Sequence, residues 1–161
     1  MGSWRGLRHG GSFPYRSSSF IGLTLATIIA DMSDYTHLNL KDADDQAPNF
    51  GLSPDLEFRM ARVPLGLEHS GLSYCRVAPG FRFPFGHKHK NQEEVYVLVS
   101  GAARMKIEDE VRDLKEWDAV RVHKDTMRSM EAGDEGAVFL IVGAPNTGPG
   151  DAEVVQGWWS K

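Results

Sequence analysis

The chain has 161 residues, of which 41% are hydrophobic and 25% are charged, as in an ordinary globular domain with a tail. Extensive disorder and a membrane-protein class are excluded for the chain as a whole. Because the first 30 residues contribute three arginines and no acidic residue, the formal charge of −4 becomes −7 for the rest. A domain that acidic lacks the clustered basic residues that neutralise phosphate backbones, so we expect no nucleic-acid partner.

Residues 1–31 form a candidate leader. A start rich in Gly, Ser and Arg runs into the apolar stretch IGLTLATIIA, which is too short to span a membrane. This composition is typical of a secretory signal, of an organelle transit peptide, and of a leader that results when the start codon is assigned upstream of Met32. We exclude the leader from the folded domain. The single cysteine, Cys75, cannot form an internal disulfide and fits a cytoplasmic protein, although the leader leaves targeting open.

The body of the chain predicts an all-β domain. Residues 32–57 form an irregular lead-in, and residues 58–145 hold short segments of β-branched and aromatic alternation closed by Gly, Pro or Asp. The predicted strands lie in EFRMARVPL, SYCRVAPG, EEVYVLVSG, ARMKIEDE, WDAVRVHKD, MRSMEAGDE and AVFLIVGAP. No stretch of ten or more residues carries a helical stripe with caps. Residues 146–161 form a tail whose two tryptophans are expected to clamp a barrel end or a subunit interface.

The segment EEVYVLVSG is apolar on both faces. Glu94, Tyr96 and Leu98 alternate with three valines, as in a strand that is buried on both sides or lines a cavity. Tyr96 is therefore a candidate for contact with a bound substrate, although a tyrosine at such a position is more often part of the core.

The stretch GHKHKNQEE holds the strongest chemical signal. Residues i and i+2 of a strand point to the same side, so His87 and His89 can direct both imidazoles at one point, and a glutamate after a short turn can join them. Imidazole and carboxylate are ligands that Zn, Fe, Mn and Ni accept. Two histidines in a Lys-rich surface turn are, however, often inert, so this pair alone is weak evidence.

The longer stretch PGFRFPFGHKHKNQEEVYVLVSG resembles the first motif of the cupin family. In that motif a glutamate follows H-x-H by three or four residues, and a glycine follows six residues later. Gly101 lies six residues after Glu94, so the resemblance implies that Glu94 is the ligand and that Glu93 points away. It also implies a double-stranded β-helix, a jelly-roll barrel with an interior site, and a homodimer.

The stretch LKEWDAVRVHKDTMRSMEAGDE resembles the second cupin motif, with departures. Arg128 stands where the family places its fourth metal ligand. An arginine cannot ligate a metal, because its guanidinium stays protonated and has no free lone pair. The four-ligand site of the family is therefore absent.

Three interpretations of Arg128 remain open. It can grip an anionic substrate beside a metal held by His87, His89 and Glu94, or it can pair with Glu94 in a metal-free binding, structural or regulatory domain. It can also turn outward while His123 replaces it. The leading hypothesis is a divalent-metal cupin that oxidises or isomerises a small anionic molecule, with Arg128 and Tyr96 as substrate contacts. Whether the chain is an enzyme is left open.

Overall fold

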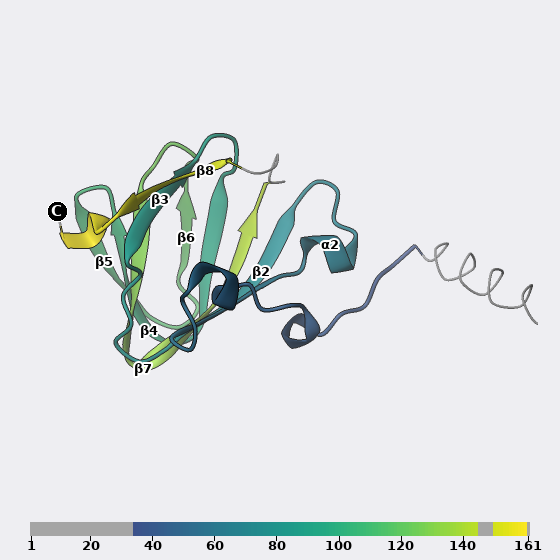
Figure 1. Ribbon diagram of the computed structural model, residues 1–161, viewed down its shortest axis with the longest axis horizontal. Helices are drawn as coiled ribbons and strands as arrows, with labels where there is room; N and C mark the ends of the chain where they lie inside the picture. Colours follow the sequence, from purple (N-terminus) through teal and green to yellow (C-terminus); the bar gives the residue numbers. More distant parts are fainter. Residues whose placement is uncertain (1–33, 145–149, 161) are drawn as a thin grey trace, which may run out of the picture. The chain divides into compact units, whose positions relative to one another are not determined.

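The computed structural model describes residues 34–144 and 150–160 (Figure 1), and the predicted leader lies outside them. The sheet lies within the unit Thr36–Lys161. Its strands are β1 (Leu56–Met60), β2 (Gly71–Val77), β3 (Phe85–His89), β4 (Glu94–Ile107), β5 (Glu110–Leu114), β6 (Ala119–Val122), β7 (Arg128–Gly143) and β8 (Ala152–Gln156). The predicted all-β class is confirmed.

The helices are short. One turn of α-helix, α2 (Arg62–Leu65), follows β1, and the 3-10 helices are η1 (Leu40–Asp42), η2 (Ala47–Phe50) and η3 (Trp158–Ser160). None of the helices in the described part of the chain is long and apolar enough to cross a membrane.

Two long strands organise the sheet. β7 pairs with β2, β3 and β4, while β4 pairs with β6 through its first half and with β5 through its second half. Because both strands change partners along their length, the antiparallel sheet curls around an interior, as Figure 1 shows. The burial of β4 alternates accordingly, with Glu94, Tyr96 and Leu98 buried and the intervening valines partly exposed.

Three of the predicted strand boundaries differ from the observed ones, and the strand β8 lies in the segment that was predicted as a tail. EEVYVLVSG and ARMKIEDE form one strand, β4, because Gly101 bends the strand at a bulge and pairing with β7 resumes beyond it. MRSMEAGDE and AVFLIVGAP likewise form one strand, β7. In EFRMARVPL the strand ends at Met60, and α2 follows, with Pro64 within the first helical turn, where proline is tolerated.

The lead-in and tail segments contact the sheet. Ala47 of η2 is completely buried in the core, and β8 pairs with β3 from Phe85↔Gln156 to His89↔Ala152. The Trp158 ring packs directly against Gly86. A Cβ added at Gly86 would lie only 2.6 Å from Cε3 of this ring, so a larger residue would clash with it. Lys106 donates from Nζ to the carbonyl oxygens of Trp158 and Trp159, at 3.2 Å each, and its ammonium lies 4.5 Å from the Trp158 ring centroid. The C-terminal residues therefore pack against β3 and β4.

The bend of β4 gives a stability prediction. Gly101 has a φ of +84°, and a Cβ there would lie 2.1 Å from the carbonyl oxygen of Gly136. Gly101→Ala should therefore lower the free energy of unfolding by about 3 kcal/mol or more, through backbone strain and steric overlap.

Gly80 provides the matched control, because its φ is +67° and a Cβ added there would meet nothing within 4 Å. Gly80→Ala should cost about 1 to 2 kcal/mol from the left-handed backbone alone. Urea denaturation of both variants measures the difference, and equal losses would contradict the importance of the Gly101–Gly136 approach.

Candidate metal centre

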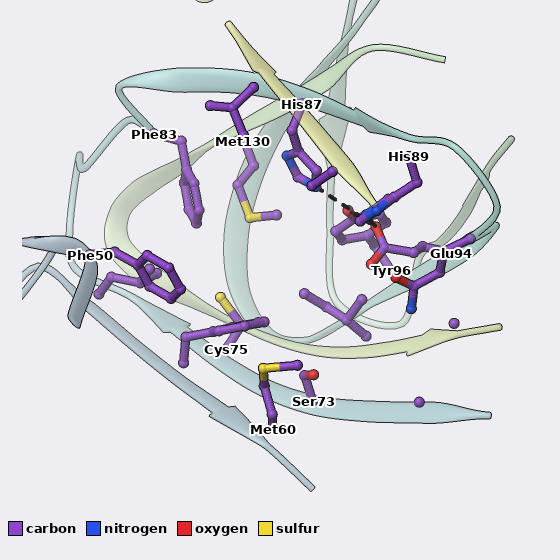
Figure 2. Close-up of a pocket in the computed structure, with 18 of the residues that line it drawn as sticks. Phe50, Met60, Ser73, Cys75, Phe83, His87, His89, Glu94, Tyr96 and Met130 are labelled. Carbon is purple, nitrogen blue, oxygen red and sulfur yellow. Dashed lines mark hydrogen bonds and ion pairs between the residues drawn. The ribbon is translucent and has the colours of Figure 1, made fainter. Parts of the chain in front are cut away.

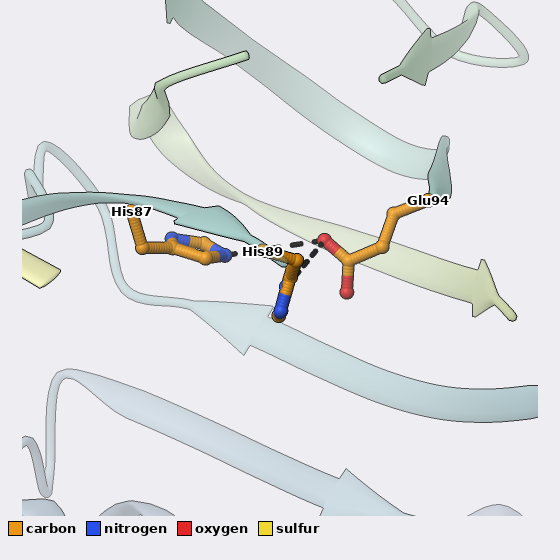
Figure 3. A group of neighbouring side chains, drawn as sticks. All are labelled: His87, His89 and Glu94. Atoms are coloured by element: carbon orange, nitrogen blue, oxygen red, sulfur yellow. Dashed lines mark ion pairs between the residues drawn. The ribbon is translucent and has the colours of Figure 1, made fainter. Parts of the chain in front are cut away.

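Strands β3 and β4 bring two histidines and one glutamate together. His87 and His89 lie on β3, on the same side of the strand, and Glu94 is the first residue of β4. One ligand atom from each lies within 4.8 Å of the other two (Figure 3). The predicted convergence of these three side chains is confirmed.

Glu93 is directed elsewhere, as predicted from the register with Gly101. Its carboxylate accepts from Nε of Arg121 at 2.7 Å, and both side chains are about half exposed. The choice of Glu94 over Glu93 therefore agrees with the geometry.

His89 is oriented by an aspartate that sequence reasoning did not identify. Asp151, which precedes β8 and is only 4% exposed, contacts Nδ1 of His89 through Oδ2 at 2.8 Å. Its other oxygen accepts from the backbone and side-chain nitrogens of Asn91, at 3.2 Å each. When the Asp151 carboxylate accepts a hydrogen bond from Nδ1–H of a neutral His89, the lone pair of the imidazole lies on Nε2.

Nε2 of His89 is the unsatisfied atom of the site. It lies 3.4 Å from Oε2 of Glu94 without the alignment of a hydrogen bond. Among the described residues it is the buried side-chain polar atom that has no hydrogen-bond partner. A buried lone pair held toward a carboxylate is unfavourable unless a cation or a proton lies between them.

His87 completes the donor set. Its Nε2 lies 3.9 Å from Oε2 of Glu94, and its ring meets the His89 ring edge-on with centroids 5.3 Å apart. Burial and the nearby Arg128 lower the pKa of His87 to about 3. The imidazole is therefore neutral near neutral pH, as a metal ligand must be.

Arg128 pairs with Glu94 rather than facing the cavity. It is completely buried, and its Nη2 donates to Oε2 of Glu94. Nη1 donates to the carbonyl oxygens of His87 and Thr126, at 3.3 and 3.2 Å, while Nε donates to the Tyr96 hydroxyl at 3.2 Å. All three guanidinium nitrogens thus have protein partners. This supports the interpretation in which Arg128 pairs with Glu94 rather than binding an anionic substrate.

The outward-turned alternative for Arg128 is wrong, because its side chain is fully enclosed. His123, the residue proposed to replace it, has a side chain that is 50% exposed and lies 3.5 Å from Asp125. It is not part of the cluster.

Tyr96 supports the same carboxylate. Its hydroxyl donates to Oε2 of Glu94 at 2.5 Å, and the ring is 1% exposed and lines the cavity. Burial raises the pKa of Tyr96 well above its ordinary value, so the phenol stays protonated. Burial alone would raise the pKa of Glu94, but contacts with His89, Arg128 and Tyr96 lower it to about 2.

The donor set fits a divalent metal. Glu94 is ionised and Arg128 is protonated, so their charges cancel, and the neutral imidazole of His87 supplies a nitrogen lone pair. Two histidines and one carboxylate on one side of a site can bind Zn, Fe, Mn or Ni while leaving coordination positions for another ligand. The unsatisfied Nε2 of His89 is the observation of this structure that agrees with such a group.

A cavity of about 500 Å³ opens beside the three residues, and Figure 2 shows many of the side chains that line it. His87, His89 and Glu94 form part of its wall, and most of the rest is apolar. Cys75 also lines it, but burial raises the pKa of this thiol to about 12, so Cys75 is not a thiolate nucleophile.

The buried pair gives a second stability prediction. Arg128→Met should lower the free energy of unfolding by about 3 to 5 kcal/mol, because Glu94 stays buried without its partner. Adding Glu94→Gln should restore part of the loss. Arg121→Met is the matched control, because the Arg121–Glu93 pair is exposed and contributes less than about 1 kcal/mol. Chemical denaturation measures all three variants, and equal losses for the two arginines would contradict this role of Arg128.

Known proteins resemble this chain in structure rather than in sequence. No protein-family model and no curated protein matches it. A cupin protein from Bacteroides fragilis is 21% identical, with a TM-score of 0.57 over 73% of this chain and 89% of its own. The nucleoside dehydratase Pac13 from Streptomyces, solved with uridine, is 14% identical, with a TM-score of 0.60 over 78% of this chain and 93% of its own.

The oxalate decarboxylase of Bacillus subtilis is 24% identical, with a TM-score of 0.60 over 74% of this chain. The match covers only 31% of that enzyme, so the similarity does not extend to the whole enzyme or to its activity. At these identities the similarity concerns the fold. The chain therefore has the cupin fold, the double-stranded β-helix that its two sequence motifs predicted.

Proposed function

We propose that His87, His89 and Glu94 bind a divalent metal ion and that the protein acts on a small anionic organic molecule in the adjoining cavity. The observation that carries this proposal is Nε2 of His89, a buried ring nitrogen that lies 3.4 Å from Oε2 of Glu94 and has no hydrogen-bond partner, while Asp151 contacts Nδ1 of the same ring. Fe, Mn, Zn and Ni all accept this donor set, and the chemistry class is oxidation or isomerisation.

The charge of the site supports an anionic ligand. Arg128 offsets Glu94, and a bound dication together with the Asp151 carboxylate beside His89 leaves the cluster with a charge of about +1 in a buried setting. An anionic group on the ligand would offset that charge. Arg128 contributes to this charge from behind Glu94, because it does not line the cavity.

A bound metal would supply Lewis acidity or redox chemistry to a ligand oxygen. The residues of the chain have separate tasks. Asp151 keeps the proton of His89 on Nδ1 and turns Nε2 toward the cluster. Arg128 and Tyr96 hold Oε2 of Glu94 through hydrogen bonds and keep the carboxylate ionised. The apolar wall excludes water from the ligand.

Two of the structural neighbours are named for reactions of small molecules, the decarboxylation of oxalate and the dehydration of a nucleoside. Those activities belong to those proteins. Since one barrel hosts such different reactions, the fold leaves the reaction of this chain to its own site residues.

A metal-free domain is the second candidate function, and the Arg128–Glu94 pair favours it. The guanidinium already gives the buried carboxylate a positive partner, as a metal would. In this alternative a proton shared between His89 and Glu94 satisfies Nε2, and the cavity binds a ligand without metal chemistry.

Metal content separates the two functions. Protein produced with Fe, Mn, Zn and Ni available should contain about one metal ion per chain, measured by plasma mass spectrometry. A His87→Ala/His89→Ala double variant should lose it, because two of three ligands are removed. His69→Ala/His123→Ala is the control, since these side chains are 95% and 50% exposed. Metal-free wild-type protein, or loss of metal in the control, would contradict the metal site.

The orientation of His89 gives a further prediction. Asp151→Asn should weaken metal binding by roughly 10- to 100-fold, because the amide no longer stabilises the proton on Nδ1 as a carboxylate does. Asp125→Asn, at an exposed aspartate beside His123, should leave the affinity unchanged. Competition with a fluorescent chelator measures both variants. An unchanged dissociation constant for Asp151→Asn would contradict the role of this residue.

The homodimer and the cytoplasmic location inferred from the sequence stay predictions. Analytical ultracentrifugation of the purified chain checks the first.

A further inference from the structure

The cavity beside the candidate metal centre has two chemically different parts. His87, His89 and Glu94 lie together in one region of its wall. Phe50, Phe83 and Met60 lie elsewhere around the cavity, as Figure 2 shows, and most of the remaining lining is also apolar. A ligand that fills this space must therefore match a polar cluster and an apolar chamber at the same time.

Apart from the cluster, the polar side chains of the wall are Arg62, Ser73, Gln92, Tyr96 and Gln156, and the rest of the chamber is apolar. Apart from Glu94 and the histidines, the charged side chain of the described wall is Arg62, whose Nε donates to the carbonyl oxygen of Leu67 at 3.3 Å. Arg62 is thus engaged by the turn that follows α2. A second anionic group on a ligand would meet mainly phenylalanine, leucine and methionine side chains, and burying it there is unfavourable.

The size of the cavity argues against a very small acid. About 500 Å³ lies within the range that accepts drug-sized ligands. A two-carbon acid would leave room for roughly ten waters against apolar walls, at about 30 Å³ per water. A ligand with a larger apolar body would displace that water, which is favourable.

We infer that the ligand is a monoanionic acid with a bulky apolar body, such as a medium-chain alkyl or an aryl-alkyl carboxylate. This inference rests on the proposed metal site, which attracts the anionic group, while the apolar chamber takes the body. Each methylene that enters the chamber should strengthen binding about threefold to fourfold. The carboxylate should strengthen binding further when the cluster is loaded with metal.

Calorimetric titration of the zinc-loaded full-length chain tests the inference. The probes are acetate, butyrate, hexanoate, octanoate, oxalate and octanamide. Affinity should rise about threefold per methylene from acetate until the chamber is full, and octanamide should bind at least tenfold more weakly than octanoate. Oxalate or acetate binding as tightly as octanoate would overturn the apolar body. Octanamide binding as tightly as octanoate would overturn the anionic group.

Variants locate the binding. Phe83→Ser should weaken octanoate at least threefold and leave acetate unchanged, since Phe83 lines the chamber. Phe50→Ser, at a lining residue that is 65% exposed, provides the same test if Phe83→Ser does not fold. Val63→Ser is the control, because Val63 is 87% exposed and outside the lining. If both phenylalanine variants bind octanoate as tightly as the wild type, the apolar body does not lie in this chamber. An equal loss of affinity in the Val63→Ser control would overturn the inference in the same way.

The metal content of the same samples keeps the two proposals distinguishable. If the protein binds none of Fe, Mn, Zn and Ni, the proposed metal function fails, and titration of the metal-free chain then shows whether affinity still rises with the chain length of the acid. If zinc is bound but octanoate has no advantage over acetate, the metal function stands and the inferred ligand class fails.

Discussion

The buried ion pair between Arg128 and Glu94 is the interaction on which the rest of the site depends. Neither charge could stay in the interior alone, since removing an ion from water is costly unless an opposite charge and hydrogen bonds replace the solvent. The guanidinium also donates to backbone carbonyl oxygens of His87 and Thr126. One side chain thus connects the beginning of β7 to the first residue of β4 and to the middle of β3, where the three strands carry the site.

Much of the fold could be predicted from the sequence, because the patterns that indicate it are local. Alternation of apolar and polar residues indicated strands, and the resemblance of the stretch from His87 to Gly101 to the first cupin motif implied the barrel. That β4 and β7 are each one long strand was harder to predict. Gly101 and Gly136 interrupt the alternation of residues, although the hydrogen bonds between the two strands continue on both sides of these glycines. The helical turn α2 was missed because four residues are too few to show a helical period.

The site shows a sharper division. His87 and His89 were predictable because residues two apart on a strand point to the same side, whereas Glu94 was implied by the resemblance to the cupin motif. The direction of Arg128 was not, since the same register allows a side chain to face the cavity or the neighbouring carboxylate. Asp151 gave no signal at all, because it lies in a Gly- and Pro-interrupted segment 62 residues from the histidine that it contacts. Only the pairing of β8 with β3 brings the two together.

This last pairing has a consequence for how the protein is made. The ribosome adds residues in order, so His87, His89, Glu94 and Arg128 leave the exit tunnel before Asp151 and β8 do. The contacts among these four residues therefore involve chain that is made earlier than the carboxylate that contacts Nδ1 of His89. The hydrogen-bond partner of Nδ1 of His89 is in place only once β8 has paired with β3.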